Sequence, residues 1–106
     1  PYLVEAYKDR MLNIHPALLP SFKGAHGIQD AYDAGVKVAG VTVHFVTEDL
    51  DSGPIILQKA FAVAEDETRD SFEKKIHELE YDIYPHAIEL LARGKLKIEG
   101  KKVRIT

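Results

Sequence analysis

Residues 38–46 read VAGVTVHFV, and this stretch decides the fold class of the 106-residue chain. β-Branched and aromatic side chains dominate it, as in strands, and Thr42 and His44 share the face opposite the apolar one. After a loop at 47–54, residues 55–63 (IILQKAFAV) predict a second strand. Because a single loop joins the two strands, we predict that they pair antiparallel.

The segments before this pair predict a helix, a strand and a loop. The chain begins without a methionine, and residues 3–10 have apolar positions at helical spacing, so we expect a fragment that starts inside a helix. Residues 11–14 (MLNI) predict a short buried strand that ends at the His15-Pro16 pair. Prolines and glycines then interrupt the sequence as far as Gly27, which indicates an ordered surface loop.

Two helices follow from the spacing of apolar residues. Residues 28–34 predict a two-turn helix that is closed by Gly35. From about Thr68 apolar residues recur every three or four positions, which predicts a long amphipathic helix. We expect Pro85 to kink this helix and Gly94 to end it. Its apolar stripe consists of Phe72, Ile76, Leu79, Ile83, Ala87 and Leu90.

The last residues and the overall order of elements indicate half of an α/β domain. Residues 95–98 and 102–105 alternate between polar and apolar side chains around Glu99-Gly100, which predicts a small hairpin. A chain of 11.9 kDa can form one hydrophobic core. A sheet of so few strands, flanked by these helices, has one face that is left uncovered. We expect an N-terminal segment, another chain or both to cover that face.

Composition excludes several classes of function. Seventeen acidic against 14 basic residues give a formal charge of −3, which argues against nucleic acid as a partner. No apolar stretch approaches the roughly 20 residues of a membrane-spanning helix, so no membrane is expected. The chain contains no cysteine, which excludes disulfides and thiolate chemistry and favours a cytoplasmic location.

Motifs for metal and phosphate binding are missing from the sequence. The five histidines lack the spacing of metal ligands, so we predict no metal. The sequence has no P-loop and no GxGxxG. A phosphate-binding turn, if the protein has one, is therefore expected outside this chain.

Asn13 and His15 are the first candidate site residues. They lie two positions apart at a strand end, so their side chains point to the same side. An amide N–H donor beside a group that exchanges protons near neutral pH suits an acyl transfer, in which an oxyanion develops. The alternative is structural: Asn13 caps the turn before Pro16 and His15 packs against it.

Three more polar residues have both a structural and a functional interpretation. Asp51 lies in an LDSGP turn, where its carboxylate either binds nearby backbone amides or orients an imidazole. His44 and Thr42 either form a hydrogen-bonded core pair or belong to a site. Spacing alone leaves these alternatives open.

Three ordered motifs occur together: NIHPALLPSFKG at 13–24, GVTVHFV at 40–46 and LDSGPIILQ at 50–58. With these motifs the chain resembles the phosphoribosylglycinamide formyltransferases over essentially its whole length. The resemblance implies an α/β fold, the C-terminal half of a Rossmann-like formyltransferase domain, with a mixed sheet flanked by helices and a C-terminal β-hairpin. Residues 1–106 are then a single catalytic, folate-binding half-domain, and the N-terminal nucleotide-phosphate-binding portion is absent.

The resemblance also implies an activity. In this family the amine of glycinamide ribonucleotide attacks the formyl group of 10-formyltetrahydrofolate, the co-substrate, in de novo purine biosynthesis. By position the catalytic residues are Asn13, His15 and Asp51. Asn13 and protonated His15 are expected to stabilise the tetrahedral oxyanion, while Asp51 supports His15 and assists proton transfer through water.

Further residues match the family's substrate-binding positions. Thr42 and His44 match positions that order the catalytic residues, the loop after the strand matches part of the folate pteridine pocket, and Glu80 matches a glutamate that contacts the ribose. The residues implied for substrate and folate binding are Thr42, His44, Val46, Thr47, Glu48, Asp49, Leu50 and Glu80. A homodimer or a complementing N-terminal segment is the expected macromolecular partner.

Three alternatives share parts of this pattern. Formyltetrahydrofolate deformylases use water as the acceptor and typically have a second histidine where this chain has Pro16. Methionyl-tRNA formyltransferases usually lack the His44-Phe45 pair and carry a further RNA-binding domain. The chain could also be a non-catalytic folate-binding or complementing fragment. The formyl acceptor distinguishes these alternatives.

Overall fold

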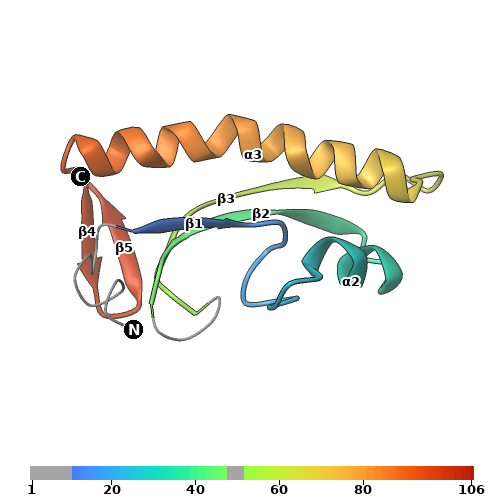
Figure 1. The fold of residues 1–106 in the computed structure, drawn as a ribbon, viewed down its shortest axis with the longest axis horizontal. Helices are drawn as coiled ribbons and strands as arrows, with labels where there is room; N and C mark the ends of the chain where they lie inside the picture. The colour runs from blue at the N-terminus through green and yellow to red at the C-terminus, as the bar shows by residue number, and fades with distance from the viewer. Residues whose placement is uncertain (1–10, 48–51) are drawn as a thin grey trace.

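The computed structural model describes residues 11–47 and 52–106. In chain order the elements are β1 (Leu12–His15), α2 (Gly27–Asp33), β2 (Val38–Phe45), β3 (Ile55–Ala62), α3 (Arg69–Ala92), β4 (Leu96–Glu99) and β5 (Lys102–Ile105) (Figure 1). This order agrees with the prediction from the first strand onward. The helix predicted at residues 3–10 lies outside the described residues.

The strands form one mixed sheet in the order β1-β2-β3-β5-β4. β1 with β2, β2 with β3, and β4 with β5 are antiparallel pairs, whereas β3 and β5 run parallel. The predicted α/β class, the antiparallel central pair and the C-terminal hairpin are confirmed. Gly100 in the hairpin turn has a φ of 65°, a left-handed conformation that glycine adopts readily.

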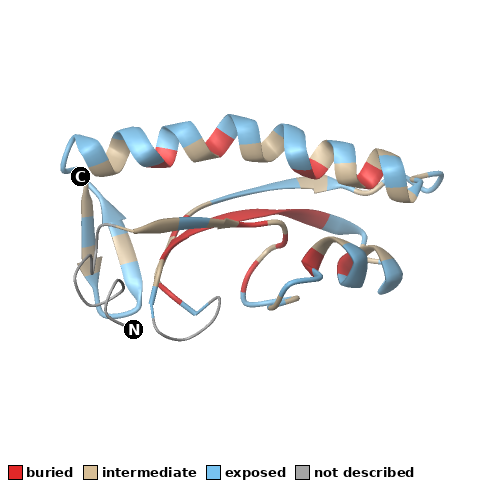
Figure 2. Cartoon of the chain, viewed as in Figure 1, coloured by how far each residue is buried: buried red, intermediate tan, exposed pale blue. Residues whose placement is uncertain are grey.

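The hydrophobic core lies between the sheet and α3. The long helix runs along one face of the sheet (Figure 1), and its buried positions face the strands (Figure 2). Phe72 packs edge-on against Tyr32 and Phe61, with ring centroids 5.6 and 5.7 Å apart. Buried aromatic contacts of this kind add roughly 0.5–1.5 kcal/mol each beyond their buried area. The predicted apolar stripe therefore faces the sheet, except that Leu91 packs against the core at the end of the helix where Leu90 was predicted.

The limits of α3 follow from local chemistry. Thr68 accepts a hydrogen bond from the backbone N–H of Ser71, and the Ser71 hydroxyl accepts one from the N–H of Thr68, at 3.0 Å each. Pro85, where we predict a kink, lies inside α3, which continues past it to Ala92 as one helix. Gly94, with a φ of 66°, follows the end of the helix as expected.

The other face of the sheet is partly covered by α2 and by the loop between β1 and α2 (Figure 1). Ala17 and Leu19 of this loop are buried, so the loop packs onto the protein. Gly35, with a φ of 68°, follows the end of α2 as predicted. None of the helices within the two described ranges is long and apolar enough to cross a membrane.

Candidate active site

Four polar side chains share the face of β1 and β2 that points away from α3. Asn13 lies opposite His44, and His15 lies opposite Thr42 in the antiparallel register. Directly opposed residues point to the same face, and the alternate residues of β2 belong to the apolar cluster under α3. Asn13 is exposed, whereas the other three residues are buried. The structure thus gathers these four predicted site residues on one polar face.

The imidazole of His15 is held by a backbone carbonyl. Its Nε2 lies 2.7 Å from the carbonyl oxygen of Phe22. A carbonyl oxygen only accepts, so Nε2 carries a proton and donates it. The ring also packs on Gly27, where a Cβ atom would lie 3.1 Å from Nε2. The loop therefore fixes the orientation of the His15 ring through Nε2.

Phe22 adopts a backbone conformation that is rare for a residue with a side chain. Its φ is 53°, in the left-handed region. This conformation costs roughly 1–2 kcal/mol, so the surrounding loop must hold it. Its carbonyl oxygen is the group that accepts the hydrogen bond from His15 Nε2–H.

Thr42 connects the polar face to the loop that follows His15. Its hydroxyl donates to the carbonyl oxygen of Ala17 at 2.7 Å and accepts from the backbone N–H of Leu19 at 3.0 Å. The residue is fully buried. These contacts attach the loop to β2 through Ala17 and Leu19.

His44 lies where β2 meets the loop that carries the LDSGP motif. Its Nδ1 lies 2.8 Å from the carbonyl oxygen of Phe45, and the ladder with β3 is irregular between Val43 and His44. The backbone N–H of Phe45 donates to the carbonyl oxygen of Pro54 at 3.0 Å. The end of the motif is therefore fixed beside His44.

The predicted folate loop is only partly described. Val46 continues the ladder, because its N–H donates to the carbonyl oxygen of Met11 at 2.8 Å, and Thr47 is exposed. Four predicted site residues lie outside the described residues. They are Glu48, Asp49, Leu50 and Asp51.

The comparisons with known proteins identify the family of the chain. A family model described as formyl transferase matches residues 1–88. The chain belongs to the formyl transferase family. The family resemblance inferred from the three sequence motifs is thus confirmed.

Individual relatives of this formyl transferase chain carry more specific names. It is 49% identical over 89 residues to a phosphoribosylglycinamide formyltransferase of Bacillus subtilis, covering 84% of the chain and 46% of the relative. A crystal structure of glycinamide ribonucleotide transformylase 1 from Symbiobacterium toebii superposes with a TM-score of 0.94 at 50% identity, covering 99% of this chain and 50% of that one.

A formyltetrahydrofolate deformylase from Pseudomonas syringae also superposes, with a TM-score of 0.94 at 30% identity. That match covers 99% of this chain and 35% of the deformylase. The chain spans about half the length of the two formyltransferase relatives. The fold is therefore shared among formyl transferases that differ in name.

Glu80 of this formyl transferase chain lies on α3, away from the polar face. Its Oε1 lies 2.6 Å from Nδ1 of His77. One turn further along the helix, the hydroxyl of Tyr84 lies 3.5 Å from the carbonyl oxygen of Leu12 in β1. Residues four apart share a helix side, so Glu80 lies on the side of α3 nearest β1.

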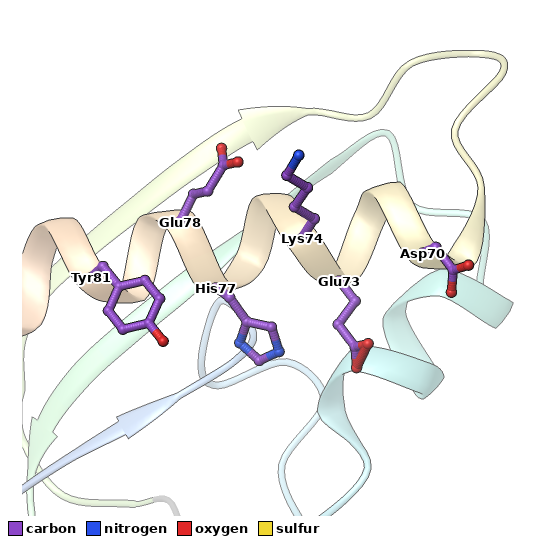
Figure 3. A pocket seen from close by; sticks show the side chains of 6 residues that line it. All are labelled: Asp70, Glu73, Lys74, His77, Glu78 and Tyr81. Atoms are coloured by element: carbon purple, nitrogen blue, oxygen red, sulfur yellow. The ribbon is translucent and has the colours of Figure 1, made fainter.

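Two hollows on the surface differ in their relation to the polar face. One, of about 510 Å³, lies on the outer surface of α3 and is lined by Asp70, Glu73, Lys74, His77, Glu78 and Tyr81 (Figure 3). All six side chains come from one helix. The other, of about 720 Å³, opens between Leu19-Pro20, residues 52–55 and the hairpin turn at Gly100-Lys101. Of these two hollows, the second is the one lined by residues of the loop that follows His15.

The sequence alone did not identify Phe22, Gly27 and Gln58. Phe22 and Gly27 contact His15 through backbone atoms, which leave no signal in side-chain chemistry. Gln58 is the last residue of the third motif, and this position was the only feature of the sequence that pointed to a role for it. In residues 11–47 and 52–106 no group of three or more histidine, cysteine, aspartate or glutamate side chains is placed to hold a metal ion.

Proposed function

We propose that this chain forms the catalytic, folate-binding half of a phosphoribosylglycinamide formyltransferase. It transfers the formyl group of 10-formyltetrahydrofolate to the amine of glycinamide ribonucleotide, a step of de novo purine biosynthesis in the cytoplasm. The placement of Asn13 beside His15 on one polar face supports this activity most directly. The formyltransferase names of the relatives at 49% and 50% identity support the choice of acceptor.

The described contacts suggest how Asn13 and His15 divide the chemistry. The amine attacks the formyl carbon, and the carbonyl oxygen becomes an oxyanion. The exposed Asn13 amide donates a hydrogen bond to this oxyanion. Protonated His15, whose Nε2–H is bound to the Phe22 carbonyl, also stabilises the oxyanion, and Asp51 supports the charged ring. When the carbon–N10 bond breaks, N10 takes up a proton and the amine nitrogen loses one, which leaves tetrahydrofolate and the formylated nucleotide.

The other predicted residues have binding or ordering roles in this proposal. Thr42 and His44 order the catalytic residues, and Glu80 contacts the ribose. The pteridine pocket includes Val46, Thr47, Glu48, Asp49 and Leu50. No metal takes part. A complementing N-terminal portion, or a second copy in a homodimer, supplies the site for the nucleotide phosphate.

Formyl transfer should be measured on two proteins. The first is the 106-residue chain itself, and the second is a chimera in which this chain replaces the matching part of the Bacillus subtilis relative. Both are incubated with 10-formyltetrahydrofolate, with and without glycinamide ribonucleotide. We expect the chimera to form the formylated nucleotide, because the catalytic residues Asn13, His15 and Asp51 then lie beside a complete phosphate site.

The controls separate the alternatives. A cooperative thermal transition by circular dichroism must first show that the chimera is folded. Hydrolysis of 10-formyltetrahydrofolate at the same rate with and without the nucleotide would favour the deformylase alternative. Against that alternative, this chain has Pro16 where deformylases typically have a second histidine. A folded chimera that binds folate but transfers nothing would favour the non-catalytic fragment. Transfer by the chain alone would contradict the half-domain proposal.

A further inference from the structure

Gln58 of β3 lies opposite Thr42 of β2, next to the polar face. Its Nε2 donates to the carbonyl oxygen of Leu19 at 2.9 Å and to Oγ1 of Thr42 at 3.0 Å. Because the Leu19 carbonyl can only accept, the amide must turn its nitrogen toward the loop. Both amide protons of Gln58 are therefore used within the protein.

Thr42 completes a clamp on the loop that follows β1. Its hydroxyl donates to the carbonyl oxygen of Ala17 and accepts from the N–H of Leu19, besides the bond from Gln58. A hydroxyl has one donor and two acceptor positions, so its hydrogen-bonding capacity is filled. Together, Gln58 and Thr42 bind both the N–H and the carbonyl of Leu19. We call this arrangement the Gln58–Thr42 clamp.

The clamped segment leads directly to the carbonyl group that holds His15. The N–H of Ser21 donates to the carbonyl oxygen of Leu18 at 3.0 Å, which closes a turn around the clamped residue. Phe22 follows this turn, and its carbonyl oxygen accepts the hydrogen bond from His15 Nε2–H, with 2.7 Å between Nε2 and the oxygen. His15 is thus fixed by β1 through its backbone and by the clamped loop through its ring.

We propose that Gln58 is a positioning residue for formyl transfer, which acts on His15 through the Leu19–Phe22 turn. The inference rests on the proposed function, because it assigns His15 a part in the reaction. Gln58 is exposed, so its replacement removes little buried apolar area and mainly removes its two hydrogen bonds. Loss of these bonds frees the Leu19 carbonyl and lets the carbonyl of Phe22 move away from the His15 ring.

The test compares Gln58→Met with Lys59→Met. Methionine keeps the length of the glutamine side chain but has no N–H donor. Lys59 is the next residue of β3, and its ammonium pairs with Asp82 of α3, so its replacement perturbs the same strand without touching the loop. In the chimera, ¹⁵N NMR follows the His15 ring nitrogens and the hydrogen exchange of the Leu19 amide. In the chimera, steady-state kinetics give kcat and both KM values.

We expect Gln58→Met to speed Leu19 amide exchange roughly five- to tenfold and to shift the His15 Nε2 signal. In the chimera kcat should fall roughly ten- to hundredfold with both KM values nearly unchanged, because misplacing a reacting group costs rate rather than binding. Gln58→Glu should behave like Gln58→Met, since it turns an acceptor toward the Leu19 carbonyl. Lys59→Met should leave all five quantities at the parent values.

Two results would overturn the inference. One is a His15 Nε2 signal in Gln58→Met that matches the parent, and the other is an equal fall of kcat in Lys59→Met. A chimera without any transfer would instead overturn the proposed function. The NMR comparison needs no catalysis, so it still decides whether Gln58 holds His15.

Discussion

Gly53 shows how a single residue sets the geometry beside the polar face. A Cβ atom on Gly53 would lie 1.7 Å from the carbonyl oxygen of Phe45 and 2.8 Å from its carbonyl carbon. Both are backbone atoms of the end of β2, so neither can rotate out of the way as a flexible side chain would. Only glycine therefore allows the LDSGP turn to approach the strand so closely.

Replacing Gly53 with alanine should destabilise the protein. The added methyl group must push the turn away from β2 and weaken the hydrogen bond from the Phe45 N–H to the Pro54 carbonyl. We expect a loss of roughly 1–3 kcal/mol in the free energy of unfolding, measured by urea denaturation. Ser52→Ala, one residue earlier, should change it by less than about 0.5 kcal/mol. Equal stability of the two variants would contradict the proposed close packing.

Asn13 is expected to contribute to rate and not to folding. Its side chain is exposed on β1, so Asn13→Ala should change stability by less than about 0.5 kcal/mol. Loss of one oxyanion donor should lower kcat of the chimera roughly 10²- to 10³-fold, with KM for both substrates little changed. A rise in KM with an unchanged kcat would show that Asn13 binds substrate and does not stabilise the transition state.

Side-chain chemistry predicted only part of the candidate site. The spacing of Asn13 and His15 predicted a shared face, and the register of β1 confirms it. The contact between His15 and the Phe22 carbonyl could not be predicted, because any residue supplies a carbonyl and only the course of the loop places it. The contact of Gln58 with the Leu19 carbonyl could not be predicted for the same reason.

At the scale of elements, the start of α3 is held by a network around Glu67. Its Oε1 accepts from Nζ of Lys75 at 2.7 Å, and its Oε2 accepts from the hydroxyl of Ser71. Its Oε1 also accepts from the backbone N–H of Ala64 at 3.2 Å. The hydrogen bond from Lys75, then that from Ser71, lowers the pKa of Glu67 from 4.5 to about 2.

This lowered pKa predicts how stability depends on pH. The ionised carboxylate stabilises the folded protein fully above the unfolded pKa near 4.5, and this contribution is lost as pH falls through about 2. Glu67→Gln should therefore lower the melting temperature at pH 6, and the difference from the parent should shrink toward pH 2. Circular dichroism melts over this range measure it. Glu65→Gln, which removes an exposed carboxylate two residues earlier, should show a smaller difference at every pH.

Helices and strands that leave a pattern in their own residues were predicted correctly from the sequence. The order in which the strands pair in the sheet was not predicted. Alternation predicted β2, β3 and the hairpin, and the first strand was placed one residue early, at 11–14 instead of Leu12–His15. The parallel pairing of β3 with β5, through Ile55 and Lys102, joins segments far apart in the sequence. No local pattern specifies such a pairing, because it depends on how α3 folds back over the sheet.

At the scale of the whole molecule, the chain is elongated and exposes much surface. Its principal extents are 44, 27 and 20 Å, and its radius of gyration is 14.3 Å, against about 13 Å for a compact chain of this length. Its accessible surface is 6860 Å², against about 5,900 Å² for a typical monomer of this mass. Large apolar side chains are among the exposed ones, including Val38 and Ile105.

This excess surface predicts association in solution. Within the described residues β1 pairs on one side only, and a strand edge with open backbone groups favours pairing with another chain. We expect the 106-residue chain to sediment as dimers or larger species at micromolar concentration. Adding the part of the Bacillus subtilis relative that this chain does not match should convert them to a one-to-one complex, because under the proposed function that part completes the same domain. A monodisperse monomer with one cooperative thermal transition would show instead that the sheet edge and the exposed apolar residues need no partner.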